Sequence, residues 1–236
     1  TTNNTVGGTT AAARNVISNN LIYGVFLNSA GATGNFVQGN YIGTDALGTS
    51  AIANGFAGVA LVNAPGNTIG GTVAGARNVV SGNAGLGITL DNLGTTGNVI
   101  SGNYIGVGAD GTTAIGNNNN GIRVVNGAAN NTIGGTAAGA GNHVSNNQWG
   151  GIYLIDGGTA GAGNRILGNA SFSNPGDQGI TLQGFAGNDG TRTAGEANLY
   201  MDTPVFTSAN LAGTLLTVSG RIGTRAAAAD RTALVV

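Results

Sequence analysis

A short pattern of alternating apolar and polar positions recurs along the chain. It consists of a glycine, an apolar residue, any residue and a second apolar residue. Its copies begin at Gly24, Gly58, Gly87, Gly121, Gly151 and Gly179. Alternation with a period of two places the apolar side chains on one face of a strand. Each copy therefore predicts a short strand that buries one face.

Longer segments repeat as well. The string N-T-V-G-G-T from Asn4 returns as N-T-I-G-G-T from Asn67 and from Asn131, at intervals of 63 and 64 residues. Between these copies, G-N-F-V-Q-G-N-Y-I-G from Gly34 returns as G-N-V-I-S-G-N-Y-I-G from Gly97. Each long period thus holds two half-units of about 30 residues, which is the length typical of a solenoid repeat. One such unit cannot bury its apolar face alone, so we predict an all-β parallel β-helix of about six stacked coils.

Three rows of inward side chains follow from this alignment. The first row is predicted to hold Val6, Val37, Ile69, Ile100, Ile133 and Ile166, and the second Ile17, Ile42, Val80, Ile105 and Val144. The apolar pairs of the glycine pattern form the third row. Together they predict one continuous apolar core along the solenoid axis.

Asparagine recurs once per coil in two further columns. They contain Asn4, Asn35, Asn67, Asn98, Asn131 and Asn164 in one column and Asn15, Asn40, Asn78, Asn103, Asn142 and Asn169 in the other. Stacked amides can satisfy one another and the buried backbone groups of a turn. The columns therefore predict two asparagine ladders. The run from Asn117 to Asn120 is interpreted as a loop instead.

The composition excludes several classes of function. Charged residues make up 7% of the chain, the net charge is −1, and lysine is absent. This balance gives no electrostatic reason to bind nucleic acid or an anionic membrane. Cysteine is also absent, which excludes disulfides and thiolate metal sites. No apolar run reaches the roughly 18 residues of a membrane helix. Because the chain starts inside a repeat and without a signal peptide, we expect a mature piece of a longer protein.

The repeat strings resemble those of large secreted or surface-anchored bacterial proteins with parallel β-helix repeats. The resemblance rests on N-T-I-G-G, A-R-N-V-V-S-G-N and G-N-Y-I-G-T-D-A-L-G-T, and it covers about residues 3–185. More distantly, the predicted fold resembles pectate lyases and polygalacturonases. The resemblance implies a right-handed single-stranded helix over 1–187, a C-terminal capping or linking segment with a short β extension over 188–236, and an extracellular or cell-surface location.

Catalytic residues are not evident. The aspartate pair, Gly-His-Gly and Arg-Ile-Lys of polygalacturonases are missing. A lyase needs a base and a cation beside the uronate carboxylate, and the nearest set to this is Asp91, Arg123, Tyr153 and Asp156. Arg123 and Tyr153 are expected in the same outward position of neighbouring coils, about 4.8 Å apart. An exposed ion pair beside an aromatic ring is the competing interpretation.

An outward column of mixed aromatic character is the candidate ligand-binding surface. It contains Val16, Tyr41, Val79, Tyr104 and His143, to which Phe36 and Phe26 are added. Such rings can stack on sugars or pack against another chain. Ordinary solvent exposure is an equally good explanation. His143 is the only histidine, which excludes a metal site built on histidines.

No cofactor is expected, although calcium remains an alternative. The carboxylates available in predicted loops belong to Asp45, Asp110, Asp189, Glu196 and Asp202. They match neither the EF-hand nor the nonapeptide calcium pattern, and Asx turns explain the loop aspartates better.

The expected function is that of a non-enzymatic structural or adhesive module, and the alternative is a carbohydrate-active β-helix, either lyase-like or glycan-binding. The expected partners are surface glycans or further copies of the chain. The first coil lacks a cap, and strands are expected at Leu215–Ser219 and Ala233–Val236 without a coil to join. Either continuation of the chain or head-to-tail stacking into a filament would cover both ends.

Overall fold

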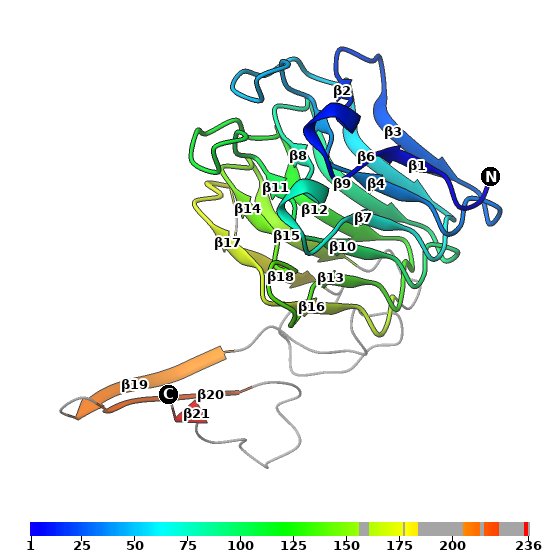
Figure 1. The fold of residues 1–236 in the computed structure, drawn as a ribbon. Helices are drawn as coiled ribbons and strands as arrows, with labels where there is room; N and C mark the ends of the chain where they lie inside the picture. Colours follow the sequence, from blue (N-terminus) through cyan, green and yellow to red (C-terminus); the bar gives the residue numbers. More distant parts are fainter. Residues whose placement is uncertain (156–160, 177, 184–204, 213–214, 222–233, 236) are drawn as a thin grey trace.

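The computed structural model describes residues 1–155, 161–176 and 178–183, and the backbone of three strands beyond them. Its main body is an all-β parallel solenoid of about six coils, stacked from the N-terminal coil to the coil that ends in β18 (Figure 1). The helical segments within these residues are two short 3-10 turns, η1 (Ala11–Ala13) and η2 (Ala74–Ala76). No helix in the described part is long and apolar enough to cross a bilayer.

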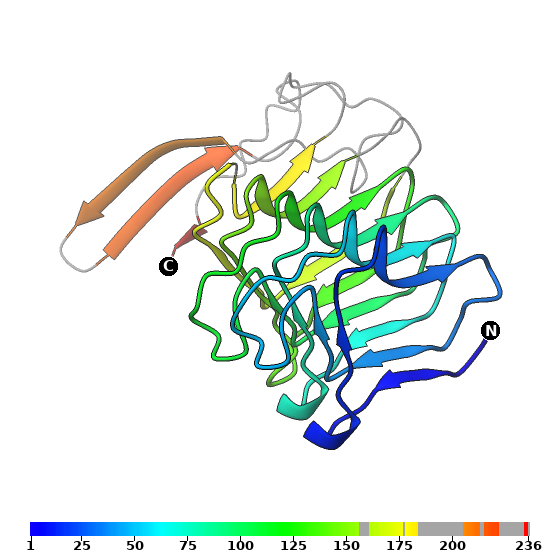
Figure 2. The same cartoon turned by 90° about the horizontal axis from the view of Figure 1, so that it is seen from above.

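Each coil contributes one strand to each of three sheets, so strands of successive coils lie side by side (Figure 2). The first sheet contains β1 (Thr5–Gly7), β4 (Phe36–Gln38), β7 (Thr68–Gly70), β10 (Val99–Ser101), β13 (Thr132–Gly134) and β16 (Arg165–Leu167). The second contains β2 (Val16–Ile17), β5 (Tyr41–Ile42), β8 (Val79–Val80), β11 (Tyr104–Ile105), β14 (His143–Ser145) and β17 (Ala170–Phe172). The third contains β3 (Tyr23–Asn28), β6 (Ala57–Val62), β9 (Leu86–Asp91), β12 (Asn120–Val125), β15 (Gly150–Ile155) and β18 (Ile180–Gln183).

The predicted inward rows are the core of the solenoid. In the first sheet, Val37, Ile69 and Ile100 are in register and have 0% exposure. The rows of the other two sheets also pair coil to coil and pack into the same apolar cluster. The second row ends in a polar residue, because Ser171 is the partner of Val144 in the last coil. The core therefore runs along the axis and becomes less apolar at this end.

Both predicted asparagine ladders are present. In each step the side-chain Nδ2 of one asparagine donates to Oδ1 of the asparagine in the next coil, at 2.8–3.2 Å. The same Oδ1 also accepts the backbone N–H, as Asn142 does for Asn103 at 3.0 Å. Asn78 additionally donates to the carbonyl of Val37. The ladders thus supply partners for buried backbone groups at the turns, where the strand ladder supplies none.

A third ladder is present that the two-column prediction missed. It consists of Asn20, Asn54, Asn83, Asn117, Asn147 and Asn174, with Nδ2–Oδ1 distances of 2.8–3.1 Å. The interpretation of Asn117 to Asn120 as a loop is wrong at both ends, because Asn117 belongs to this ladder and Asn120 begins β12. The sequence carries the signal: the first five members stand four residues before the glycine of the strand pattern.

Close stacking of coils explains one class of glycine. Gly106 adopts φ +86°, and a Cβ atom at this position would lie 1.9 Å from the carbonyl oxygen of Ser145 in the next coil. Gly70 is in the same situation against Ser101, at 2.0 Å. A side chain would therefore clash with the next coil and also strain the backbone.

The C-terminal region contains a separate antiparallel sheet. β19 (Val205–Ala212) pairs with β20 (Leu215–Arg221), and β20 pairs with β21 (Leu234–Val235). This agrees with the strands expected at Leu215–Ser219 and near the C-terminus. The predicted boundary between 187 and 188 lies outside the described residues.

Candidate functional site

In the outward column of the second sheet, each of the two tyrosines is covered by an arginine. The predicted register is correct, because Val16, Tyr41, Val79, Tyr104 and His143 occupy equivalent positions on successive strands. Arg14 lies over the ring of Tyr41 with its Cζ atom 4.1 Å from the ring centroid. Arg77 has the same relation to Tyr104, at 4.0 Å.

Two loops cover part of this column, which corrects the expected exposed aromatic surface. Tyr41 is only 9% exposed and Val79 only 2%. A Cβ atom on Gly48 would lie 3.0 Å from the ring of Tyr41, and one on Gly111 would lie 2.9 Å from the ring of Tyr104. The loops thus approach the rings closely through glycines. The Tyr41 ring is therefore occupied by packing within the chain rather than available to a ligand.

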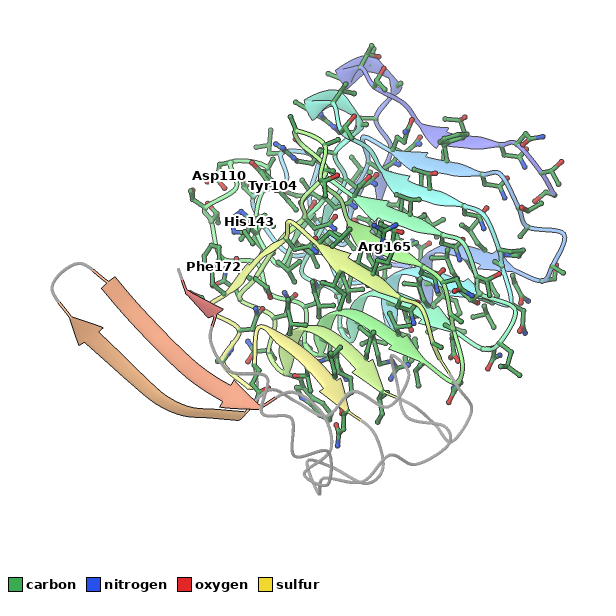
Figure 3. All side chains as sticks on the ribbon, turned by 90° about the horizontal axis from the view of Figure 1, so that it is seen from below. Tyr104, Asp110, His143, Arg165 and Phe172 are labelled. Carbon is green, nitrogen blue, oxygen red and sulfur yellow. The ribbon has the colours of Figure 1, made fainter. Side chains whose placement is uncertain are left out.

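The column is more open toward its C-terminal coils, where Tyr104 and His143 are half-buried and the nearby Phe172 is exposed. The rings of Tyr104 and His143 meet edge to face at 5.6 Å, and those of His143 and Phe172 lie 4.9 Å apart. Figure 3 shows Tyr104, His143 and Phe172 following one another along one edge of the solenoid, while Arg165 lies on a different face. Burial, and then the charge of Arg77, lowers the pKa of His143. This environment favours a neutral imidazole that packs as an aromatic ring.

Phe36 and Phe26 do not extend this column. Phe36 is exposed on β4 of the first sheet, whereas Phe26 is on β3 of the third. Phe26 stacks on Tyr23 at 4.6 Å, and Tyr23 meets Phe56 edge to face at 5.7 Å. The candidate aromatic residues are therefore distributed over three sheets, and they do not form one surface.

The loop aspartates are used by their own loops. Asp45 accepts the backbone N–H of Thr49 at 2.7 Å, a bond that lowers its pKa. Asp110 accepts the Oγ1–H of Thr113 at 2.6 Å and two backbone N–H groups, which together lower its pKa strongly. No group of three or more potential metal-ligating side chains occurs among the described residues. The calcium candidates Asp189, Glu196 and Asp202 lie outside them.

Three of the four candidate catalytic residues can be placed on the outer face of the third sheet. Arg123 and Tyr153 occupy neighbouring outward positions of β12 and β15, as expected. Asp91 is at the end of β9, where it pairs in register with Val125 and accepts the Nδ2–H of Asn126 at 2.8 Å. Asp156 lies outside the described residues. Tyr153 donates its hydroxyl hydrogen to Gln183 on β18.

A groove of about 700 Å³ opens beside Arg123 and Tyr153. The turn that connects β14 to β15 adds Gln148 and Trp149 to the lining of the groove, and β15 adds Ile155. The Trp149 side chain is 63% exposed. A cation, two aromatic rings and amide groups therefore line one concave surface.

Arg123 differs in its hydrogen bonds from Arg14 and Arg77, which follow the 3-10 turns η1 and η2. Arg14 and Arg77 each donate Nε–H to a backbone carbonyl, at 3.2 Å and 3.1 Å. The Nε of Arg123 is buried and has no hydrogen-bond partner in the described part of the chain. Burial lowers its pKa, while the charge of Asp91 acts in the opposite direction. The guanidinium is thus a partly desolvated cation whose donors are not all matched.

Sequence reasoning missed several residues of this surface. Trp149 stands two residues before the glycine that begins the strand pattern of its coil, and Gln148 precedes it. The signal for Trp149 was its position, since the one tryptophan of the chain stands in the turn that leads into a strand predicted to have an outward face. No family model, no curated protein and no solved structure matches this chain.

Proposed function

We propose that this chain is a non-enzymatic structural and adhesive module of an extracellular or cell-surface protein. The observation that carries the proposal is the contrast between the inside and the outside of the solenoid. Three unbroken ladders and three apolar rows repeat from coil to coil. The outward column of the third sheet instead varies, through Phe26, Ala60, Thr89, Arg123, Tyr153 and Thr181.

A constant interior beneath a variable outer face suits display of a binding surface where that face is accessible. In this column Phe26 is exposed and Arg123 and Tyr153 are half-buried, whereas Ala60, Thr89 and Thr181 are buried. The scaffold holds outward side chains at the fixed spacing of neighbouring strands, about 4.8 Å, so that an extended polymer can contact several coils at once. The resemblance of the repeat strings to those of secreted and surface-anchored bacterial proteins supports an extracellular location.

The test asks whether the chain is retained on a polysaccharide or a cell surface without cleaving it. The chain is incubated with insoluble polysaccharides and intact bacterial cells, and the bound fraction is compared with released reducing ends and with the ultraviolet absorbance of unsaturated uronates. We expect retention on at least one surface and no product. Absence of retention on every surface, or turnover by the purified chain, would overturn the proposal.

The second candidate is a carbohydrate-active enzyme. The observation that favours it is the adjacency of Arg123 and Tyr153 beside a groove, with the charge of Asp91 acting on Arg123. Turnover that is lost in Arg123→Gln, with an unchanged melting temperature, would establish this candidate instead.

A further inference from the structure

We propose that the groove on the outer face of the paired strands β12 and β15 binds an acidic saccharide, with Arg123 holding an oxyanion of the sugar while Trp149 and Tyr153 face its rings. This inference rests on the proposed adhesive function and names its ligand class and its site. Three features carry it: an incompletely satisfied cation, one exposed and one half-buried aromatic ring, and an amide-bearing rim in one concave surface.

Arg123 provides the charge recognition. A guanidinium removed from water loses hydration that must be replaced by hydrogen bonds or by a counter-charge. Asp91 acts on Arg123 through space, but its Oδ1 accepts from Asn126. In the neighbouring outward position, the Oγ1 of Thr89 is likewise buried without a partner in the described part of the chain. Because the Nε is buried, the two Nη atoms of the fork are the donors that would meet an oxyanion in two-point geometry.

The aromatic rings provide the apolar recognition. Trp149 is 63% exposed and lines the groove together with Tyr153. Large aromatic faces of this kind bind flat apolar surfaces, and the C–H face of a pyranose ring is such a surface. The amides of Asn119 and Gln148 stand on the same lining. Because amides both donate and accept, they suit sugar hydroxyls.

The charge distribution favours a saccharide over a nucleic acid. Single-stranded nucleic acid is bound by aromatic stacking together with a positively charged groove that follows the phosphates. Among the described residues that line this groove, Arg123 is the one cation, and the whole chain has a net charge of −1. A single cation provides no positively charged path along successive phosphates, whereas one arginine beside two rings is enough to hold the acidic group of one sugar unit.

The experiment measures binding of the full 236-residue chain to polygalacturonate, a sulfated galactan, a neutral galactan and a single-stranded oligonucleotide. We expect binding of polygalacturonate, the sulfated galactan or both, weakened by added salt, and weak binding of the other two. Preference for one acidic polymer identifies the oxyanion as carboxylate or sulfate. Equal affinity for the neutral galactan, or tighter binding of the oligonucleotide, overturns the inference.

Matched variants locate the site. Arg123→Gln is expected to weaken binding about tenfold to a hundredfold, as for loss of a charge-assisted contact. Trp149→Ala is expected to weaken it about two- to tenfold. Arg165→Gln removes the same charge from an exposed position of the first sheet, and Phe172→Ala removes an exposed ring from the second, so both controls should bind like the parent chain. If Arg123→Gln fails to fold, the site is tested by Trp149→Ala, whose side chain is exposed: weakened binding supports the groove and unchanged binding contradicts it.

Failure of the inference and failure of the proposed function are distinguishable. Unchanged binding in both groove variants shows that the chain is adhesive but that the groove is not the site. Turnover of an acidic polymer that depends on Arg123 shows that the ligand class is right but that the function is enzymatic. Absence of binding to both acidic polymers, with retention on another surface, overturns the inference alone.

Discussion

The guanidinium of Arg77 lies over the ring of Tyr104, with its Cζ atom 4.0 Å from the ring centroid. Arg14 and Tyr41 repeat this relationship one long period earlier, at 4.1 Å. In both pairs the arginine also donates to a backbone carbonyl of the next coil. The pair therefore joins neighbouring coils through a side chain, in addition to the ladders.

A double-mutant cycle on Arg77 and Tyr104 tests this relationship. We expect Arg77→Leu and Tyr104→Leu to show a coupling of about 0.5–2 kcal/mol in the free energy of unfolding, because a cation held over an aromatic ring is stabilising. The bond from Arg77 to Gly102 is lost in both arginine variants and cancels. The same cycle on Arg165 and Tyr104 should give a coupling near zero.

Adjacent asparagines provide a matched test of the ladders. Asn117→Ala is expected to lower the free energy of unfolding by about 1–3 kcal/mol, because buried groups lose their partners. Asn98→Ala and Asn103→Ala should behave in the same way. Asn118→Ala should be nearly neutral, since Asn118 is exposed. Thermal or urea unfolding measures the difference, and equal losses at Asn117 and Asn118 would contradict the ladder account.

Glycine substitution tests the close approach of coils. Gly106→Ala is expected to destabilise the fold by more than about 1 kcal/mol. Gly106 has φ +86°, and the new Cβ atom would lie 1.9 Å from the carbonyl oxygen of Ser145 in the next coil. Gly31→Ala places its Cβ atom where nothing lies within 4 Å. The melting temperature of the Gly31 variant should therefore stay close to that of the parent chain.

The environment of His143 predicts a pH dependence. Burial and Arg77 lower its pKa below the ordinary value of 6.5. The imidazole therefore contributes stability that is fully present above that value and is lost as the pH falls through the lower folded pKa. His143→Phe keeps a ring at this position and removes the titration.

Melting temperatures at pH 7 and pH 5 check this expectation. The parent chain should lose more than His143→Phe between the two pH values, because other titrating groups are common to both. A larger loss in the variant would show that protonated His143 stabilises the fold, contrary to the direction of the pKa shift.

Much of the scaffold could be predicted because it is periodic. Val37, Ile69 and Ile100 recur in equivalent positions, and each proved to be fully buried and in register. Two ladders were found for the same reason. The third was missed because Asn117 lies in a run of four asparagines, where its column is hidden. Its spacing to Gly121 was the available signal.

The candidate surface was less predictable. The alignment placed Tyr41 and Tyr104 outward, which is correct, but outward from a coil does not mean exposed to solvent. A loop crosses Tyr41 and leaves it 9% exposed. Loop paths depend on contacts between segments of different coils, such as the bond from the Ala109 N–H to the Gly48 carbonyl oxygen at 2.9 Å. A repeat alignment contains no such information.

The sequence by itself determined the solenoid, its register and the adjacency of Arg123 and Tyr153, because one coil must bury its apolar face against the next and identical units stack in one way. Only the tertiary structure decided which outward residues meet solvent. It covered Tyr41 with a loop, and it gathered Trp149, Arg123 and Tyr153 around one groove. The physical reason is that burial of an outward side chain depends on what lies over it. The covering loops recur once in each long period, as Gly48 against Tyr41 and Gly111 against Tyr104, and not once in each coil.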